Sequence, residues 1–110
     1  MTASHTVAVL GGGSFGTVIA NIIAGNGTGV TLWLRNLDRA ECIHQRRRNV
    51  DYLPDYPLHD ALRATVSLEE AVAGVDIILV AVPSKSFREV VRELSGLISG
   101  DTVLISLTKG

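Results

Sequence analysis

The stretch that decides the fold reads Val7-Ala8-Val9-Leu10-Gly11-Gly12-Gly13-Ser14-Phe15-Gly16. Its four consecutive apolar residues are typical of a central parallel strand that is buried on both faces. The glycines then fit the pattern G-x-G-x-x-G, and a helical period begins at Ser14. A single buried stripe is predicted for this helix, made of the apolar residues that share helical spacing: Phe15, Val18, Ile19, Ile22 and Ile23.

The remainder of the chain continues this alternation of short apolar runs and amphipathic stretches. Strands are predicted at 30–34, 64–66, 77–82 and 102–105. The strand 64–66 is expected at an edge of the sheet, and Pro83 ends the strand 77–82. Helices are predicted from an N-cap at Asp38 toward Arg48, after a cap at Ser67, and along a stripe from Phe87 to Ile98. The fold class is therefore α/β, a Rossmann-type domain with a mainly parallel sheet and helices on both faces.

Length and composition restrict the classes of protein that need consideration. The 110 residues suffice for one domain, and 46% hydrophobic with 19% charged residues is typical of a folded chain. A net charge of −1 gives no support to nucleic-acid binding, and no apolar run is long enough to span a membrane. The single cysteine, Cys42, and the lack of a signal peptide favour a cytoplasmic protein.

Each glycine of the motif has a mechanical role in binding a dinucleotide. Gly11 permits the tight turn, Gly13 lets a pyrophosphate approach the backbone, and Gly16 allows close contact between helix and strand. The N-terminus of the helix offers unpaired N–H groups and a positive dipole end to the phosphates. The alternative is a glycine-rich turn that binds no ligand, and the strand–turn–helix context favours the dinucleotide site.

The end of the second strand is where such folds bind the adenosine ribose. NAD-specific folds place Asp or Glu there, whereas this chain has Arg35-Asn36. A guanidinium can bind a 2′-phosphate bidentately, which favours NADP as the cofactor. Asp38 is near in the sequence, so NAD is retained as the alternative cofactor. The alternative is a solvated surface arginine. Arg46-Arg47-Arg48 could extend an electropositive field near a phosphate ligand, and we favour the alternative of a solvated helix end that complements the dipole.

Few other residues offer chemistry. Lys109 follows the last predicted strand at the edge where ligands bind, so its position is equally compatible with a functional and a surface lysine. Lys85 is expected on an exposed first turn, and Cys42 is expected to contribute packing. The scattered histidines give no metal-ligand spacing, so no metal site is predicted.

Five blocks of sequence together resemble a known family. They are GGGSFG (11–16), VTLWLRN (30–36), RRNVDYLPDYPL (47–58), AVPSKSFREVVREL (81–94) and SLTKG (106–110). In content and spacing they closely resemble the bacterial NAD(P)-dependent glycerol-3-phosphate dehydrogenases, over essentially the whole chain. Two departures are mild: Gly12 stands where alanine or serine is frequent, and Phe15 where tryptophan or tyrosine is frequent.

The resemblance implies an enzyme that reduces dihydroxyacetone phosphate to sn-glycerol 3-phosphate with NADPH or NADH, for phospholipid synthesis. It implies a catalytic and substrate-binding role for Lys109, beside the nicotinamide. The cofactor-binding residues that the motif and the resemblance give together are Gly11, Gly13, Ser14, Phe15, Gly16, Arg35, Asn36, Tyr52, Pro83 and Lys109.

Members of this family continue into a helical C-terminal domain that carries a second lysine and most of the substrate pocket, and they are homodimers. The resemblance thus makes residues 1–110 the N-terminal cofactor-binding domain, expected to bind cofactor without turning over substrate alone. The alternatives are a related reductase of the ketopantoate or hydroxyacyl-CoA type and a non-catalytic NAD(P)-sensing module.

Overall fold

The structure, a computed structural model, describes residues 6–11, 13–47, 57–59, 61–98 and 100–107. These residues form one sheet of five strands, all parallel, in the order β3-β2-β1-β4-β5. The elements in chain order are β1 (Thr6–Leu10), α1 (Ser14–Gly25), β2 (Gly29–Trp33), α2 (Leu37–Arg46), β3 (Leu62–Thr65), α3 (Leu68–Val72), β4 (Ile77–Val80), α4 (Ser84–Leu94) and β5 (Val103–Ser106). The predicted α/β fold is confirmed, and β3 lies at an edge as predicted.

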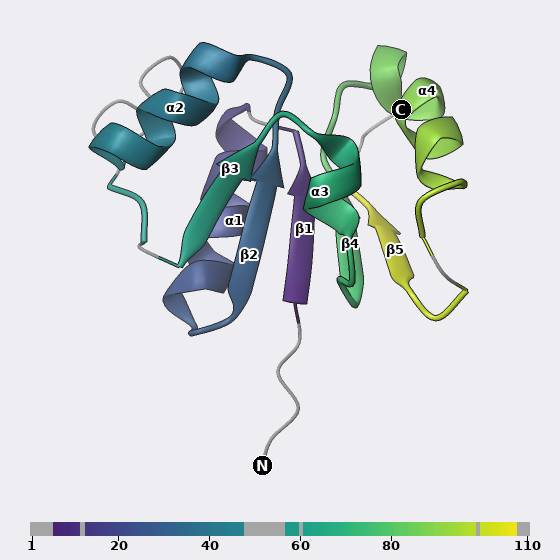
Figure 1. Cartoon of the computed structure of the whole chain (residues 1–110), viewed down its shortest axis with the longest axis horizontal. Coiled ribbons are helices and arrows are strands. Elements are labelled where there is room, and N and C mark those ends of the chain that lie inside the picture. Colours follow the sequence, from purple (N-terminus) through teal and green to yellow (C-terminus); the bar gives the residue numbers. More distant parts are fainter. Residues whose placement is uncertain (1–5, 12, 48–56, 60, 99, 108–110) are drawn as a thin grey trace.

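Helices cover both faces of the sheet (Figure 1). On one face, α1 and α2 pack on alternate residues of the strands, with Val9, Leu32 and Ile43 fully buried. On the other face, α3 and α4 enclose a second cluster that includes Leu10, Trp33 and Leu94. The two clusters follow from the pleat, because successive side chains of a strand point to opposite faces.

The stripe predicted for α1 is wrong at Phe15 and Ile22, whereas Ile23 packs against the core as predicted. Phe15 is 57% exposed and Ile22 54% exposed, whereas the helix buries Thr17, Ala20 and Ala24 completely. The buried side chains are small because α1 lies close to the sheet, and the larger apolar residues are therefore displaced to the flanks and the outer face. Helical spacing alone does not distinguish these two stripes, since both have the same period.

The start of α2 also differs from the prediction. Asn36, and not Asp38, is the N-cap, and its side-chain oxygen accepts a hydrogen bond of 3.0 Å from the Arg39 N–H. Asp38 lies in the first turn, where its charge complements the helix dipole. The predicted cap at Ser67 is confirmed, because its hydroxyl accepts from the Glu70 N–H at 3.2 Å.

The outer edge of β3 is closed by side chains of and after α2. His44 Nε2 accepts a hydrogen bond of 3.0 Å from the Ala64 N–H. The Arg47 guanidinium donates to the carbonyl oxygens of His59 and Leu62, the latter at 2.8 Å. The Ala64 N–H and the Leu62 carbonyl belong to β3 and face away from β2, so these bonds reduce the template that an edge strand offers to other chains.

The sequence led us to predict that Arg47 belongs to a solvated helix end, and this prediction is wrong. Its backbone adopts the left-handed conformation at the C-cap, with φ 54°, and its carbonyl oxygen accepts from the Leu58 N–H at 2.7 Å. This turn directs the guanidinium back toward the sheet. Arg46 remains exposed as predicted, and Arg48 lies outside the described residues.

The opposite edge of the sheet is formed by β5, whose four residues are all exposed. Val103, Leu104 and Ile105 are 53%, 40% and 43% exposed.

None of the described helices is long and apolar enough to cross a membrane.

Replacing Arg47 with Ala is expected to lower the free energy of unfolding by about 1–3 kcal/mol, because two carbonyl groups lose a charged donor. The left-handed backbone adds nothing to this difference, since neither Arg nor Ala favours it. Urea unfolding followed by circular dichroism measures the change. Arg46→Ala removes the same charge from an exposed position and should stay within about 0.5 kcal/mol of the parent chain. Equal losses in the two variants would contradict the role of Arg47.

Candidate functional site

The carboxyl ends of all five strands lie at one edge of the sheet, because the strands are parallel. β1 lies between β2 and β4, and the chain leaves β1 toward one face and β4 toward the other. Ligands of open α/β sheets bind outside the strand ends at such a switch point. Two backbone hydrogen bonds join the strand ends here, from Gly11 N–H to Trp33 O at 2.9 Å and from Ala81 N–H to Leu10 O at 2.8 Å.

Gly11 is required by both its conformation and its surroundings. Its φ of +128° lies in the region that residues with a side chain rarely adopt. A Cβ at this position would lie 2.6 Å from the Ala81 carbonyl oxygen and 2.8 Å from the Ala81 carbonyl carbon. The turn after β1 therefore lies directly against the backbone that follows β4.

Gly16 and Gly13 have different surroundings. A Cβ on Gly16 would overlap the carbonyl oxygen of Gly11, so this glycine lets the first turn of α1 contact the end of β1. A Cβ on Gly13 would meet nothing within 4 Å. The φ of Gly13 is also an ordinary −75°. The fold itself therefore does not require a glycine at position 13. A ligand that must approach the backbone closely would require one.

The two helices that begin at the switch point lack side-chain caps. α1 starts after Gly13 and α4 after Pro83, and in neither case does a side chain of the cap residue bond the first turn. By contrast, α2 and α3 are capped by the side chains of Asn36 and Ser67. No side chain of the cap residue therefore bonds the N–H groups at the start of α1, where the helix dipole attracts an anion.

The first turn of α1 also carries Phe15, which extends into solvent beside the glycine turn. Ser14 begins the helix. On the neighbouring helix, Pro83 is exposed at the carboxyl edge, and Lys85 is exposed on the first turn of α4 as predicted.

Arg35 lies just past the end of β2, on the same edge of the sheet. Its guanidinium carbon is 5.4 Å from the centroid of the Trp33 ring, a cation–π distance. The Trp33 indole N–H donates to the Val66 carbonyl oxygen at 3.1 Å, and the residue is only 5% exposed. An exposed cation is thus supported from below by a buried ring.

The remaining predicted site residues are placed as follows. The Asn36 side-chain oxygen is engaged in the cap of α2, which leaves its amide N–H groups for a ligand. Tyr52 and Lys109 lie outside the described residues, as does Gly12. Cys42 is half-buried within α2, in agreement with a packing role. Among the described His, Cys, Asp and Glu residues, no group of three could hold a metal ion.

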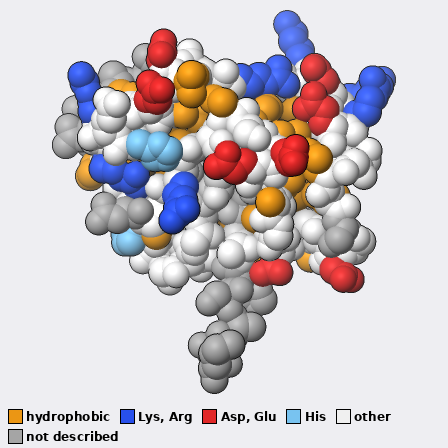
Figure 2. All heavy atoms as spheres, viewed as in Figure 1, with side chains coloured by type: hydrophobic (Ala, Val, Ile, Leu, Met, Phe, Trp, Pro, Cys, Tyr) orange, Lys and Arg blue, Asp and Glu red, His pale blue; other side chains and the backbone are white. Residues whose placement is uncertain are grey.

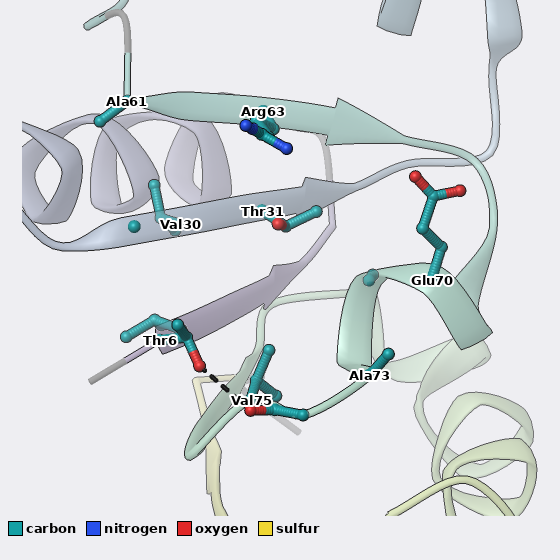
Figure 3. A pocket seen from close by; sticks show the side chains of 12 residues that line it. Thr6, Val30, Thr31, Ala61, Arg63, Glu70, Ala73 and Val75 are labelled. Atoms are coloured by element: carbon teal, nitrogen blue, oxygen red, sulfur yellow. Dashed lines mark hydrogen bonds between the residues drawn. The ribbon is translucent and has the colours of Figure 1, made fainter. Parts of the chain in front are cut away.

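The face seen in Figure 2 carries basic and acidic side chains interspersed, without a continuous basic surface. A hollow of about 410 Å³ lies over the amino-terminal parts of β1 and β2 (Figure 3). Thr31 and Arg63 point into it from the strands, and Glu70 lines it from α3. This hollow is separate from the glycine turn, and its opposite charges do not converge on one class of ligand.

Sequence reasoning missed two parts of this site. Ala81 contributes backbone atoms only, and its contact with Gly11 depends on β4 lying beside β1, which local sequence does not reveal. Trp33 could have been found, because an aromatic ring only two residues before an arginine is a ready partner for its guanidinium. It is also the only tryptophan in the chain.

The strand order, the glycine turn and the uncapped α1 define the class of dinucleotide-binding Rossmann domains. The comparisons specify the family. Residues 6–110 match the model of the NAD-dependent glycerol-3-phosphate dehydrogenase N-terminus, and the chain belongs to this family.

The curated relatives are longer than this chain. It is 52% identical over 110 residues to the glycerol-3-phosphate dehydrogenase (NAD(P)+) of Saccharophagus degradans, covering 100% of this chain and 31% of that protein. The same identity holds for the enzyme of that name from Teredinibacter turnerae, of which 32% is covered. The chain therefore spans about a third of the length of these relatives.

Solved structures agree with this assignment. The glycerol-3-phosphate dehydrogenase of Coxiella burnetii superposes with a TM-score of 0.92 at 37% identity, over 97% of this chain and 33% of that one. A pyrroline-5-carboxylate reductase from Coxiella burnetii has a TM-score of 0.76 at 19% identity, over 98% of this chain and 37% of that one, and shares the fold alone.

The three glycines are expected to differ in their effect on stability. Gly11→Ala and Gly16→Ala should each lower the free energy of unfolding by at least about 2 kcal/mol, because the added Cβ meets backbone atoms that cannot move freely. Gly13→Ala should change it by less than about 1 kcal/mol, because the position is open and its φ suits alanine. Thermal unfolding of the three variants checks this order. A Gly13→Ala loss as large as that of Gly16→Ala would show that Gly13 has a packing role.

Proposed function

We propose that this chain is the cofactor-binding part of an NAD(P)-dependent glycerol-3-phosphate dehydrogenase. The observation that carries the proposal is Gly13, a motif glycine whose missing side chain leaves open space in front of an uncapped helix. The cofactor's pyrophosphate would lie there, held by N–H groups of the first turn of α1. Ser14 and Phe15 flank this position at the start of the same helix.

The adenosine end of the cofactor would extend over the end of β2. Arg35 is exposed there and would bind a 2′-phosphate bidentately, so NADPH is favoured over NADH. Asn36 would offer its amide N–H groups beside it. Asp38, in the first turn of α2, is close in sequence and keeps some use of NADH open, since a carboxylate favours a 2′-hydroxyl.

Pro83, at the start of α4, would contact the nicotinamide end, because dinucleotides of such folds bind across the switch point. When bound, the reduced nicotinamide supplies a hydride to the ketone carbon of dihydroxyacetone phosphate, and protonation of the oxygen gives sn-glycerol 3-phosphate. Lys109, which resembles the family lysine, would orient the substrate and stabilise the negative charge on that oxygen. Tyr52 is proposed as a further cofactor contact on the same resemblance.

The larger context is proposed from the relatives and the resemblance. Most of the substrate pocket and a second lysine would belong to a helical C-terminal domain, and the complete enzyme would be a homodimer. A cytoplasmic location fits the single cysteine and a role in supplying glycerol phosphate for phospholipid synthesis.

Gly13→Ala is expected to weaken binding of NADPH and NADH by at least about ten-fold while the chain stays folded, because the methyl group occupies the approach of the pyrophosphate. Isothermal titration calorimetry measures both affinities. Gly25→Ala is the matched control, since a Cβ at the far end of the same helix also meets nothing within 4 Å. Unchanged affinities in Gly13→Ala would mean that the glycine turn binds no dinucleotide.

Arg35→Ala is expected to weaken NADPH binding by about 10- to 100-fold and NADH binding much less, because only NADPH carries the phosphate that the guanidinium contacts. Equal effects on the two cofactors would remove Arg35 from the 2′-phosphate site.

The 110-residue chain is expected to bind cofactor without turning over substrate. Absorbance of NADPH in the presence of dihydroxyacetone phosphate measures turnover, and steady oxidation by the purified chain would contradict this expectation.

A further inference from the structure

We propose that Trp33 is the positioning residue that sets cofactor selectivity, by holding the Arg35 guanidinium ready for the 2′-phosphate. The inference rests on the proposed function, and it adds a residue that does not itself touch the ligand. Its basis is the stacked pair at the end of β2, in which a charged group on the surface lies over a ring anchored in the core.

The pair forms where the chain leaves the strand. Arg35 lies in the bend two residues after Trp33, and its guanidinium lies over the Trp33 ring. The distance of 5.4 Å from the guanidinium carbon to the ring centroid is within the range of a cation–π contact, and tryptophan is the strongest aromatic partner. Within the described part of the chain, no hydrogen bond or ion pair engages the guanidinium, so its N–H donors stay available for a ligand.

The ring that supports Arg35 is itself fixed. Trp33 is 5% exposed and belongs to the core cluster under α3 and α4. Its indole N–H donates to Val66 O at 3.1 Å, just after β3. The adjacent backbone hydrogen bond, from Leu34 N–H to Thr65 O at 3.0 Å, ties the same two segments together. The ring orientation is therefore set by the core and by a neighbouring segment.

A fixed ring changes the affinity for one cofactor and not the other. A free arginine side chain loses considerable rotamer freedom when a phosphate binds it, and a guanidinium already restrained over a ring loses less. NADH has no 2′-phosphate, so it gains nothing from this restraint. Loss of the ring face should therefore alter the ratio of the two affinities, whereas a purely structural loss would lower both together.

The experiment measures NADPH and NADH affinities by calorimetry for the parent chain, Trp33→Leu and Trp33→Phe. Trp33→Leu should weaken NADPH binding by about two- to five-fold relative to NADH, the range that a partly exposed cation–π contact gives. Trp33→Phe retains an aromatic face and should keep most of the selectivity. Arg46→Ala, an exposed charge at the far end of α2, should leave the ratio unchanged.

A double-mutant cycle isolates the coupling between the two residues. In an Arg35→Ala background, Trp33→Phe and Trp33→Leu should no longer alter the NADPH to NADH ratio, because the group that the ring positions is gone. Two results would overturn the proposal. One is an effect of the Trp33 variants on the NADPH to NADH affinity ratio that persists without Arg35. The other is a loss of NADPH affinity in Trp33→Leu and Trp33→Phe that equals the loss of NADH affinity.

A fluorescence measurement that keeps Trp33 avoids any dependence on how the Trp33 variants fold. Trp33 is the only tryptophan, so its fluorescence reports on the ring beneath Arg35. Adenosine 2′,5′-bisphosphate should change the emission more than 5′-AMP does, and Arg35→Ala should abolish the difference. Identical changes with both nucleotides would overturn the role of Trp33. If the parent chain binds neither dinucleotide, the proposed function falls together with this inference.

Discussion

The contact between Gly11 and the Ala81 carbonyl oxygen is the constraint on which the rest of the site depends. It fixes how closely the turn after β1 approaches the segment after β4, and Gly16 in turn fits against the Gly11 carbonyl oxygen. With α1 held in this way, the start of the helix lies at the switch point between the strands. The small residues Ala20 and Ala24 continue the close approach along the sheet. Unlike Gly11 and Gly16, Gly13 is left open, at the place where an anion would bind.

Polar groups near the switch point differ in their hydrogen bonding from those elsewhere in the fold. At the switch point the helix starts are left without side-chain caps, whereas α2 and α3 have theirs. Away from the site, side chains satisfy the backbone, as His44 and Arg47 do for β3. Arg35 is restrained by a ring face, and none of the other described residues hydrogen-bonds its guanidinium. The starts of α2 and α3 are thus bonded internally, whereas no side chain of the cap residue bonds the start of α1 at the switch point.

The sequence predicted the fold class and every described strand to within one or two residues, because apolar runs and glycine turns are local signals. It failed where the outcome depends on tertiary distance. The buried stripe of α1 depends on how near the helix lies to the sheet, which favours Ala20 and exposes Phe15. Arg47 belongs to the fold because a left-handed C-cap turns it toward β3. Of the candidate site, the sequence predicted the glycine turn and Arg35. It did not predict that the Trp33 ring supports Arg35.

The central place of β1 also has a consequence for folding kinetics. β1, α1 and β2 are consecutive and can associate early, whereas β4 joins β1 across a long stretch of chain, with Thr6 and Asp76 in contact 70 residues apart. The switch point does not exist until that distant pairing has formed. A nucleotide bound at the switch point would then bind only the fully assembled sheet and would shift the equilibrium away from partly opened states in which β1 and β4 have separated.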